Sequence, residues 1–263
     1  NIREVDAVVY VLRAFGNDKI VNVQSGIDIL RDKEILETEL VLKDLETVEN
    51  RLESLQKDIR AGKKEAVKEA EILSKALGFL SQGKTLIEQA WPDEEKKAIV
   101  SYQLLTAKPR LYLLNGSEND VSPELKETFY KSNCVFLIMD ILMELEAADL
   151  TAEEKASLGL AEESKINELI KESYRLLGLI TFLTTGPDET RAWTLKKNKT
   201  APQAGGVIHS DFERGFIKAE VINWEKLLAA SGWNSARDRG WLRTEGREYV
   251  VADGDVVFFK HAL

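Results

Sequence analysis

The run Leu111-Tyr112-Leu113-Leu114 is followed by the polar stretch Asn115-Gly116-Ser117-Glu118-Asn119-Asp120. A short apolar run that ends at turn-forming residues is typical of a buried strand. Two further runs of this kind, Ala7–Leu12 and Cys134–Met139, occur before and after it, and helical patterns separate the runs. Strands that alternate with helices imply a parallel sheet of the α/β class.

Composition limits the class of protein. The chain has 263 residues, of which 44% are hydrophobic and 31% charged, and its net charge is −9. This length is enough for one large domain or for two to three small ones. The composition excludes a disordered or collagen-like chain. The acidic balance argues against a protein that coats nucleic acid through its bulk charge.

Cysteine content and hydropathy bear on the compartment. Cys134 is the only cysteine, which excludes an internal disulfide and a multi-cysteine zinc site and favours a reducing compartment. No apolar run approaches the roughly 20 residues that a membrane helix needs, and no signal peptide is visible. We therefore expect a cytoplasmic protein without a membrane partner, and we assign no metal ligands.

Two apolar seams with heptad spacing predict a helical hairpin. Each seam repeats at alternating intervals of three and four residues, and Gly62 lies between them. The first seam is Val41, Leu45, Val48, Leu52, Leu55 and Ile59, and the second is Ala66, Ala70, Leu73, Leu77 and Leu80. Such an element either projects as an arm that docks on a partner or simply packs its seams together, and the pattern does not separate these hypotheses. After Pro92, residues Ala98–Leu105 are expected to be helical.

Strand-like segments dominate the chain after Leu179. The expected strands are Leu179–Leu183, Ala192–Leu195, Phe216–Ile222, Glu248–Val251 and Val256–Phe259. A small mixed sheet with one or two short helices fits a β-grasp module. Residues 179–263 have 12 basic and 11 acidic side chains, for a net charge of +1, whereas the rest of the chain has −10. This module is therefore the better contact for an anionic partner. Its aromatic residues are expected mainly in the core, with one or two exposed to RNA bases: Phe212, Phe216, Trp224, Trp233 and Trp241.

One tempting motif is Gly78-x-x-x-x-Gly83-Lys84-Thr85, a formal match to the P-loop pattern. A phosphate-binding loop of this kind must follow a buried strand. The residues before Gly83 instead have a helical seam, so we interpret the match as a polar turn at the end of the arm. An unrelated NTPase that uses Lys84 remains a third hypothesis for function.

Two other polar groups are candidate site residues. Asn115 and Glu118 follow the Leu111–Leu114 strand, where doubly wound proteins place ligand-binding loops. An amide and a carboxylate are suited to the edge of a nucleobase, although a plain turn gives the same pattern. His209 has no accompanying nucleophile and carboxylate pattern, which favours a structural or helix-capping role over that of a catalytic base.

Seven segments, spread over essentially the whole chain, form a recognisable set: Asn1–Ala7, Arg13–Asp18, Leu104–Pro109, Arg191–Thr194, Thr200–Ala204, Ile208–Glu213 and Tyr249–Val256. Together they resemble the YchF, or Obg-like ATPase, subfamily of P-loop NTPases (TRAFAC class, Obg type). The C-terminal segments are the most specific.

This resemblance implies a domain plan and a function. It implies a partial Ras-like nucleotide-binding domain over residues 1–30 and 98–178, an inserted α-helical coiled-coil arm over 31–97, and a TGS domain of β-grasp fold over 179–263. Members of the family bind and hydrolyse ATP with Mg²⁺, often in preference to GTP, and associate with ribosomes. The partners implied for this chain are the large ribosomal subunit and RNA.

The same resemblance implies the base-binding residues. The family has Asn-x-x-Glu where GTPases have Asn-Lys-x-Asp, and this motif maps onto Asn115 and Glu118, with Gly116 between them. The aspartate that pairs with guanine is displaced, so guanine loses its bidentate partner. Phe15 falls where the family places an aromatic residue near the nucleotide.

The family's P-loop, its Mg²⁺-binding threonine and its switch segments belong before Asn1, so we expect this chain to lack them and assign it no catalytic residue. The apolar strand Ala7–Leu12 is also expected to pair with a neighbouring strand on each side. Without the P-loop, phosphoryl transfer loses its main electrostatic stabilisation, and ATP hydrolysis is expected of the intact protein. The usual small-residue loop of the last base-contacting motif is altered around Met139-Asp140. The alternative function is a nucleotide-independent RNA- or ribosome-binding module that acts through the TGS domain and the arm.

Overall fold

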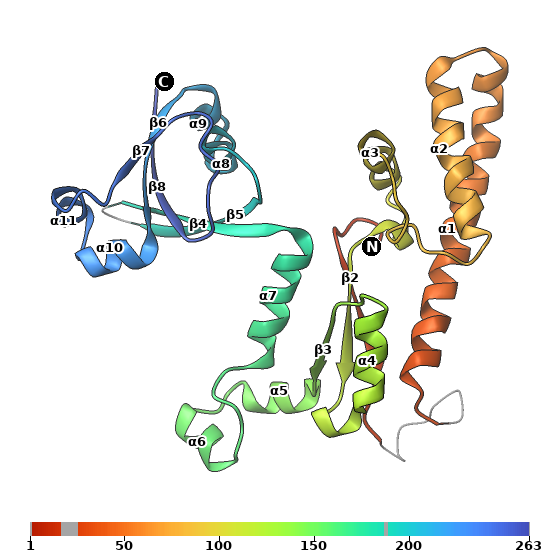
Figure 1. The fold of residues 1–263 in the computed structure, drawn as a ribbon, viewed down its shortest axis with the longest axis horizontal. Helices are drawn as coiled ribbons and strands as arrows, with labels where there is room; N and C mark the ends of the chain where they lie inside the picture. The colour runs from red at the N-terminus through yellow and green to blue at the C-terminus, as the bar shows by residue number, and fades with distance from the viewer. Residues whose placement is uncertain (1, 17–25, 187–188, 263) are drawn as a thin grey trace. The chain divides into compact units, whose positions relative to one another are not determined.

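The computed structural model describes residues 2–16, 26–186 and 189–262. The chain forms two compact units, residues 1–173 and 174–263, and each is described here by itself. Figure 1 shows the helices and strands of both units. No helix in the described part of the chain is both long enough and apolar enough to span a membrane.

The N-terminal unit contains a three-stranded parallel sheet in the order β1-β2-β3. Its strands are β1 (Val8–Arg13), β2 (Arg110–Asn115) and β3 (Phe136–Met139). The parallel sheet expected from the sequence is therefore confirmed. Strand β2 lies in the centre, and four of its side chains, Leu111 to Leu114, are almost inaccessible to solvent. The outward side chains of β1, Val9 and Val11, are exposed.

Aromatic packing joins this sheet to its covering helices. Tyr112 makes edge-to-face contacts with Tyr10 and Phe129, at ring-centroid distances of 5.3 and 5.6 Å. Phe129 comes from α4, which covers one face of the sheet together with the start of α1. Apolar burial and aromatic pairing thus fix both helices on the sheet. The helices of this unit are α1 (Ile29–Arg60), α2 (Lys64–Leu80), α3 (Asp93–Ser101), α4 (Pro123–Lys131), α5 (Ile141–Ala147), α6 (Ala152–Ser157) and α7 (Lys165–Leu177), which continues into the C-terminal unit.

Helices α1 and α2 form the hairpin that the heptad seams predict. The turn between them includes Gly62, whose φ of +75° is a conformation that glycine adopts without strain. Both seams contribute to one apolar cluster, in which Val48, Leu73 and Leu80 are almost fully buried. Figure 1 shows the two helices side by side. The seams pack on each other, and the opposite faces are mainly polar, although Leu42 and Val67 are exposed there.

A buried carboxylate fixes the base of this hairpin. Asp44 on α1 is inaccessible to solvent and accepts hydrogen bonds from the backbone N–H groups of Leu105 (2.9 Å) and Thr106 (2.7 Å). It also accepts one from the Thr106 hydroxyl at 2.8 Å. These bonds hold the short 3₁₀ turn η1 (Leu105–Ala107) against α1.

This arrangement corrects one prediction. The helix expected over Ala98–Leu105 is instead α3, which ends at Ser101, and Gln103 adopts a φ of +53°. Asp44 takes the N–H groups of Leu105 and Thr106, so these groups do not extend the helix. The interacting residue is 61 positions away in the sequence, and local periodicity does not reveal it.

Replacing Asp44 with alanine is expected to lower the free energy of unfolding of the N-terminal unit by about 2–4 kcal/mol, because buried N–H groups lose their only charged acceptor. Urea denaturation measures this change in the free energy of unfolding, and hydrogen exchange of the α1 amides locates it in the hairpin. The matched control is Asp58→Ala, which removes an exposed ion pair with Lys63 at the other end of the hairpin and is expected to cost less than about 1 kcal/mol. Equal costs for the two variants would contradict the anchoring role of Asp44.

The C-terminal unit is a five-stranded mixed sheet in the order β5-β4-β8-β6-β7. Only the β4–β8 pair is parallel. The strands are β4 (Leu179–Thr185), β5 (Thr190–Lys196), β6 (Phe216–Asn223), β7 (Arg243–Glu245) and β8 (Asp255–His261), and the helices are α8 (Ala201–Ile208), α9 (Ser210–Arg214), α10 (Trp224–Ala230) and α11 (Trp233–Asp238). The mixed sheet and four of its five expected strands are therefore confirmed.

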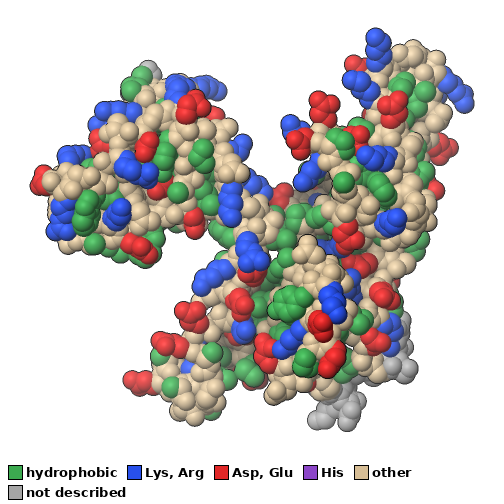
Figure 2. Space-filling model, in the orientation of Figure 1, with side chains coloured by type: hydrophobic (Ala, Val, Ile, Leu, Met, Phe, Trp, Pro, Cys, Tyr) green, Lys and Arg blue, Asp and Glu red, His purple; other side chains and the backbone are tan. Residues whose placement is uncertain are grey.

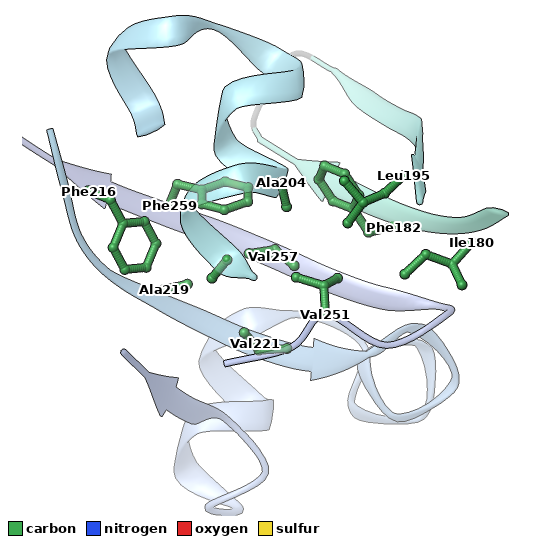
Figure 3. Close-up of a cluster of buried hydrophobic side chains, with 11 residues drawn as sticks. Ile180, Phe182, Leu195, Ala204, Phe216, Ala219, Val221, Val251, Val257 and Phe259 are labelled. Carbon is green, nitrogen blue, oxygen red and sulfur yellow. The ribbon is translucent and has the colours of Figure 1, made fainter. Parts of the chain in front are cut away.

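The core of this unit lies between the sheet and α8. Figure 3 shows Phe182, Leu195, Phe216 and Phe259 pointing from the strands toward Ala204 on α8. Ala201 and Ala204 are fully buried, and their small side chains let the helix approach the aromatic layer closely. Phe216 is thus a core residue, as expected, and Phe212 packs against the same cluster.

The strand expected over Glu248–Val251 does not form. Only an isolated bridge joins Thr200 to Val250, and β7, which the sequence analysis missed, lies a few residues earlier. The cause is the buried carboxylate of Asp255, which accepts hydrogen bonds from the Tyr249 hydroxyl (2.6 Å) and from the N–H of Ala252 (2.9 Å). These bonds tie Tyr249 and Ala252 to the start of β8, and the segment between them forms only the bridge to Thr200. Burial and the hydrogen bond to Asp255 raise the pKa of Tyr249 to about 12.

Gly215 is required where the start of β6 meets the end of the chain. A Cβ atom there would lie 2.0 Å from the carbonyl oxygen of Ala262, whereas one at Gly246 would meet no atom within 4 Å. Gly215→Ala is expected to lower the thermal unfolding midpoint of the C-terminal unit by several degrees, because a backbone atom must move. Gly246→Ala is the matched control. Circular dichroism on both variants tests this expectation, and equal midpoints would contradict it.

Candidate functional site

The carboxyl ends of the three parallel strands meet at one edge of the N-terminal sheet. In the strand register Arg13, Asn115 and Met139 are neighbours across the sheet. The carbonyl oxygen of Asn115 accepts hydrogen bonds from the N–H groups of Ala14 (2.8 Å) and Phe15 (3.2 Å). The backbone of Phe15 is thereby attached to the strand that ends at Asn115. Ligand-binding loops of open α/β sheets lie at edges of this kind.

The side chain of Asn115 has a defined orientation. Its Oδ1 accepts a hydrogen bond from the N–H of Ile141 at 3.1 Å, at the first residue of α5. The carboxylate of Asp140 caps the same helix by accepting from the N–H of Met143 at 3.0 Å. Because the oxygen of Asn115 is engaged, the two hydrogens on Nδ2 are the ones it can offer to a ligand acceptor.

Gly116 allows the loop to cross closely over the end of β1. A Cβ atom at this position would lie 3.0 Å from the Cβ of Ala14 and 3.1 Å from the backbone nitrogen of Phe15. Its N–H donates to the carbonyl oxygen of Met139 at 3.2 Å, which also ties the loop to β3. A larger residue would push the loop away from β1, so glycine keeps Phe15 and Asn115 adjacent.

The ring of Phe15 is half-buried beneath a cation. The guanidinium carbon of Arg13 lies 4.9 Å from the ring centroid, and its Nε donates to the carbonyl oxygen of Phe15 at 3.1 Å. An aromatic face held in this way at a strand end is available for stacking against a planar ligand.

Glu118 begins the 3₁₀ turn η2 (Glu118–Asp120). Asp120 closes this turn by accepting from the N–H and the hydroxyl of Ser117, both at 2.7 Å, and these bonds lower the pKa of Asp120. The Glu118 carboxylate is exposed and lies 2.7 Å from Nζ of Lys126 and 4.0 Å from Nζ of Lys165. The structure thus places Phe15, Asn115, Gly116 and Glu118 along one strand edge and the loop that follows it.

The two lysines beside Glu118 are residues that the sequence analysis missed. Lys126 follows the loop on α4, and Lys165 lies 47 positions after Glu118, at the start of α7. No local pattern connects these positions with Glu118. Only the opposite charges hint at a pairing, and the chain has 36 Lys and Arg residues, so charge alone does not select these two.

The P-loop-like motif lies elsewhere and lacks the required geometry. Gly78 is within helix α2, which confirms that a helix and not a strand precedes Gly83. Nζ of Lys84 donates to Oε1 of Gln82 at 2.8 Å. Thr85 is buried and accepts a hydrogen bond from Arg110 at 3.3 Å. Thr85 is thus turned into the protein, Lys84 is bonded to a neighbouring side chain, and the two do not surround a space for phosphates.

His209 is a helix cap, one of the roles expected for it. Its Nδ1 accepts a hydrogen bond from the N–H of Asp211 at 3.3 Å at the start of α9. Among the described residues, no group of three or more His, Cys, Asp or Glu side chains is placed to hold a metal ion.

Figure 2 shows the charges on one face of the molecule. Lysine and arginine side chains are interspersed with acidic ones over the visible surface of both units.

Comparisons with known proteins cover nearly the whole chain. A family model described as "YchF-GTPase_C: Protein of unknown function (DUF933)" matches residues 179–262. The "Ribosome-binding ATPase YchF" of Bacillus subtilis (strain 168) is 42% identical over 272 residues, which cover 99% of this chain and 74% of the relative. "Obg-like ATPase 1" of Oryza sativa subsp. japonica is 36% identical, with 99% of this chain and 69% of the relative covered.

A solved structure gives the same result for the fold. The YchF GTPase of Schizosaccharomyces pombe matches with a TM-score of 0.82 and 33% sequence identity, over 98% of this chain and 73% of that one. The mixed α/β fold described above is therefore similar to that of a YchF GTPase. The chain belongs to the YchF/Obg-like family of ribosome-binding ATPases.

Proposed function

We propose that the carboxyl edge of the β1-β2-β3 sheet binds the base of an adenine nucleotide through Phe15, Asn115, Gly116 and Glu118. The observation that carries this proposal is the orientation of Asn115 by the N–H of Ile141. Its Nδ2 donors suit the acceptor nitrogens of a purine ring, and the half-buried ring of Phe15 offers a face on which the base stacks.

Glu118 supplies the preference for ATP over GTP. A carboxylate only accepts hydrogen bonds, so it pairs with the exocyclic amino group of adenine, whereas the six-position oxygen of guanine would face it unfavourably. This loop also has no aspartate in the position from which ordinary GTPases make two hydrogen bonds to guanine. Lys126 and Lys165 pair with the carboxylate and hold it near the loop.

Phosphoryl transfer is not assigned to any residue of this chain in our proposal, and none is assigned as a Mg²⁺ ligand. Lys84 and Thr85 do not substitute for a P-loop, since Lys84 bonds to Gln82 and Thr85 is buried under Arg110.

The base-binding proposal predicts a loss of nucleotide affinity in Glu118→Gln. We expect wild-type chain to bind a fluorescent ATP analogue more tightly than the GTP analogue. The substitution should weaken ATP-analogue binding about tenfold or more, because one charge-assisted hydrogen bond contributes roughly 1.5–3 kcal/mol. Fluorescence titration gives both dissociation constants.

Two control variants accompany that titration. Glu127→Gln removes an exposed glutamate that also pairs with a lysine, at 2.8 Å, but lies on α4 away from the strand edge. Lys84→Ala tests the P-loop-like motif. Both should leave affinity unchanged. Loss of binding in Lys84→Ala, or no binding by the wild-type chain, would overturn the proposed site.

Ribosome association is the second part of the proposal. The relatives are named as ribosome-binding ATPases, and we propose that this protein contacts the large ribosomal subunit and RNA. The domain interpretation belongs here too: a partial Ras-like domain over 1–30 and 98–178, a coiled-coil arm over 31–97, and a TGS domain over 179–263. The hairpin supports a docking role through its polar outer side, where Arg51 and Glu69 form an exposed ion pair at 2.6 Å.

The second candidate function is a nucleotide-independent RNA- or ribosome-binding module. The observation in its favour is the charge difference along the chain: residues 179–263 have a net charge of +1, and the remainder has −10. Binding in this case would use the C-terminal unit and the hairpin, without nucleotide chemistry.

Ribosome pelleting separates the two candidates. The chain is expected to sediment with purified large subunits, and the bound fraction should fall as salt is raised, because contacts to phosphates release counterions. Added ATP should change the bound fraction under the first candidate and leave it unchanged under the second. A chain that stays in the supernatant at low salt would contradict both.

A further inference from the structure

One face of the C-terminal sheet is only partly covered. Helices α8 and α9 pack on the other face, over the core that contains Phe182 and Phe259. On the partly covered face, α10 and α11 pack over a second small cluster that includes Ile222 and Val256. Beyond that cluster Phe258, on β8, leaves half of its side chain, 49%, exposed to solvent. The exposed ring offers a flat apolar surface to a planar ligand.

The strand register places basic residues beside Phe258 on the same face. Strands β6 and β8 are antiparallel, and Glu220 lies opposite Phe258, with Lys218 opposite Lys260. Directly opposed residues in an antiparallel pair point to the same side of the sheet. The face therefore presents an aromatic ring, one carboxylate and two lysines on neighbouring positions of two central strands.

The carboxylate is already compensated. Glu220 is paired with Arg237 of α11 at 2.9 Å and with Lys260 at 3.1 Å, and these two cations lower the pKa of its carboxyl. Lys218 adds a third cation, so the local charge is positive. Like charges placed directly opposite each other destabilise a sheet. The opposed Lys218 and Lys260 therefore lower the stability of the fold, and an anionic ligand between them would restore it.

A pocket adjoins these residues. It has a volume of about 410 Å³ and is lined by Thr185, Gly186, Glu220, Trp233, Arg237 and Phe258. The rings of Trp233 and Phe258 lie 6.4 Å apart at an interplanar angle of 66°. The pocket is thus bounded by two aromatic rings and by the exposed Arg237, and a planar group of nucleobase size fits between such walls.

We propose that this face binds single-stranded RNA, with one unpaired base stacked on Phe258 in the pocket and the adjacent phosphates held by Lys218, Arg237 and Lys260. Exposed aromatic rings flanked by cations on an open sheet are how proteins bind unpaired bases. The net positive charge of the face favours an anionic ligand over an uncharged or basic peptide, and the aromatic rings of Trp233 and Phe258 favour a planar base over an acidic side chain. This inference rests on the ribosome association proposed above, for which it names the contacting residues.

The test uses the whole 263-residue chain and a fluorescently labelled oligouridylate of about ten nucleotides, with fluorescence anisotropy as the readout. Phe258→Ala is expected to weaken binding at least about fivefold, the lower limit for loss of one base–aromatic stack. Lys218→Gln should reduce the slope of log affinity against log salt by about 0.7, the value for one phosphate contact on a single strand.

Two control variants lie next to each other on α4 of the other unit. Tyr130→Ala truncates a similarly exposed aromatic side chain, and Lys131→Gln removes an exposed lysine. Both should bind the oligonucleotide like wild type. Circular dichroism melting establishes that each variant is folded, which Phe258→Ala should be because half of the ring already contacts water.

Each outcome decides the inference. Weakened binding in Phe258→Ala but not in Tyr130→Ala supports it. Equal binding by all variants, absence of RNA binding by wild type, or equal affinity for a duplex of the same length would overturn it. If Phe258→Ala reduces ribosome pelleting while oligouridylate does not compete with ribosomes, the face contacts a ribosomal protein and the RNA inference fails. If the wild-type chain pellets with ribosomes and Phe258→Ala pellets equally well, only this RNA site is contradicted. If the wild-type chain does not pellet, the proposed ribosome association is contradicted.

Discussion

The position of β2 between two parallel neighbours is the constraint on which the N-terminal unit depends. Its backbone pairs along both edges, with β1 and with β3, and Leu111 and Leu114 are fully buried. Burial of each such side chain contributes roughly 1.5–3 kcal/mol, and the pairing satisfies backbone groups that water does not reach. Because β2 is held between two strands, Asn115 at its end has a fixed position, from which the candidate ligand-binding loop begins.

The opposite end of β2 is where the helical hairpin is attached. Arg110 lies 3.2 Å from the carboxylate of Glu37 on α1 and also pairs with Glu88, beyond the end of α2. The hydroxyl of Tyr112 donates to Glu37 as well, and burial raises the pKa of that hydroxyl. A six-residue strand, about 20 Å long at 3.3 Å per residue, thus connects the base of the hairpin with the candidate nucleotide site. A movement of the Asn115 loop that shifts β2 would act directly on these ion pairs.

The C-terminal unit uses its two sheet faces differently. One face is buried beneath α8, whose alanines permit close packing on an aromatic layer. The other is completed only in part by α10 and α11, which leaves Phe258 and its cationic neighbours at the surface. Core packing and the proposed RNA contact therefore use residues that alternate along the same strand, since Val257 and Phe259 face the core on either side of Phe258. The expectation that one or two aromatic residues of this module are exposed is met by Trp224 and Trp241, which are 43% and 36% exposed, whereas the sequence does not single out Phe258.

The sequence by itself determined the hairpin, the parallel sheet and most strands of the C-terminal unit, because spacing of apolar residues is a local property that burial enforces. It also nominated the Asn115–Glu118 segment as a base-binding candidate by its family motif. Only the tertiary structure decided where α3 ends, why Glu248–Val251 does not form a strand, and which lysines meet Glu118. In each of these places a charged side chain binds groups that are distant in sequence or outside the local pattern: Asp44 binds η1, Asp255 binds Ala252, and Lys165 approaches Glu118. Such contacts depend on how the helices and strands pack together, and the spacing of apolar residues along the sequence does not predict them.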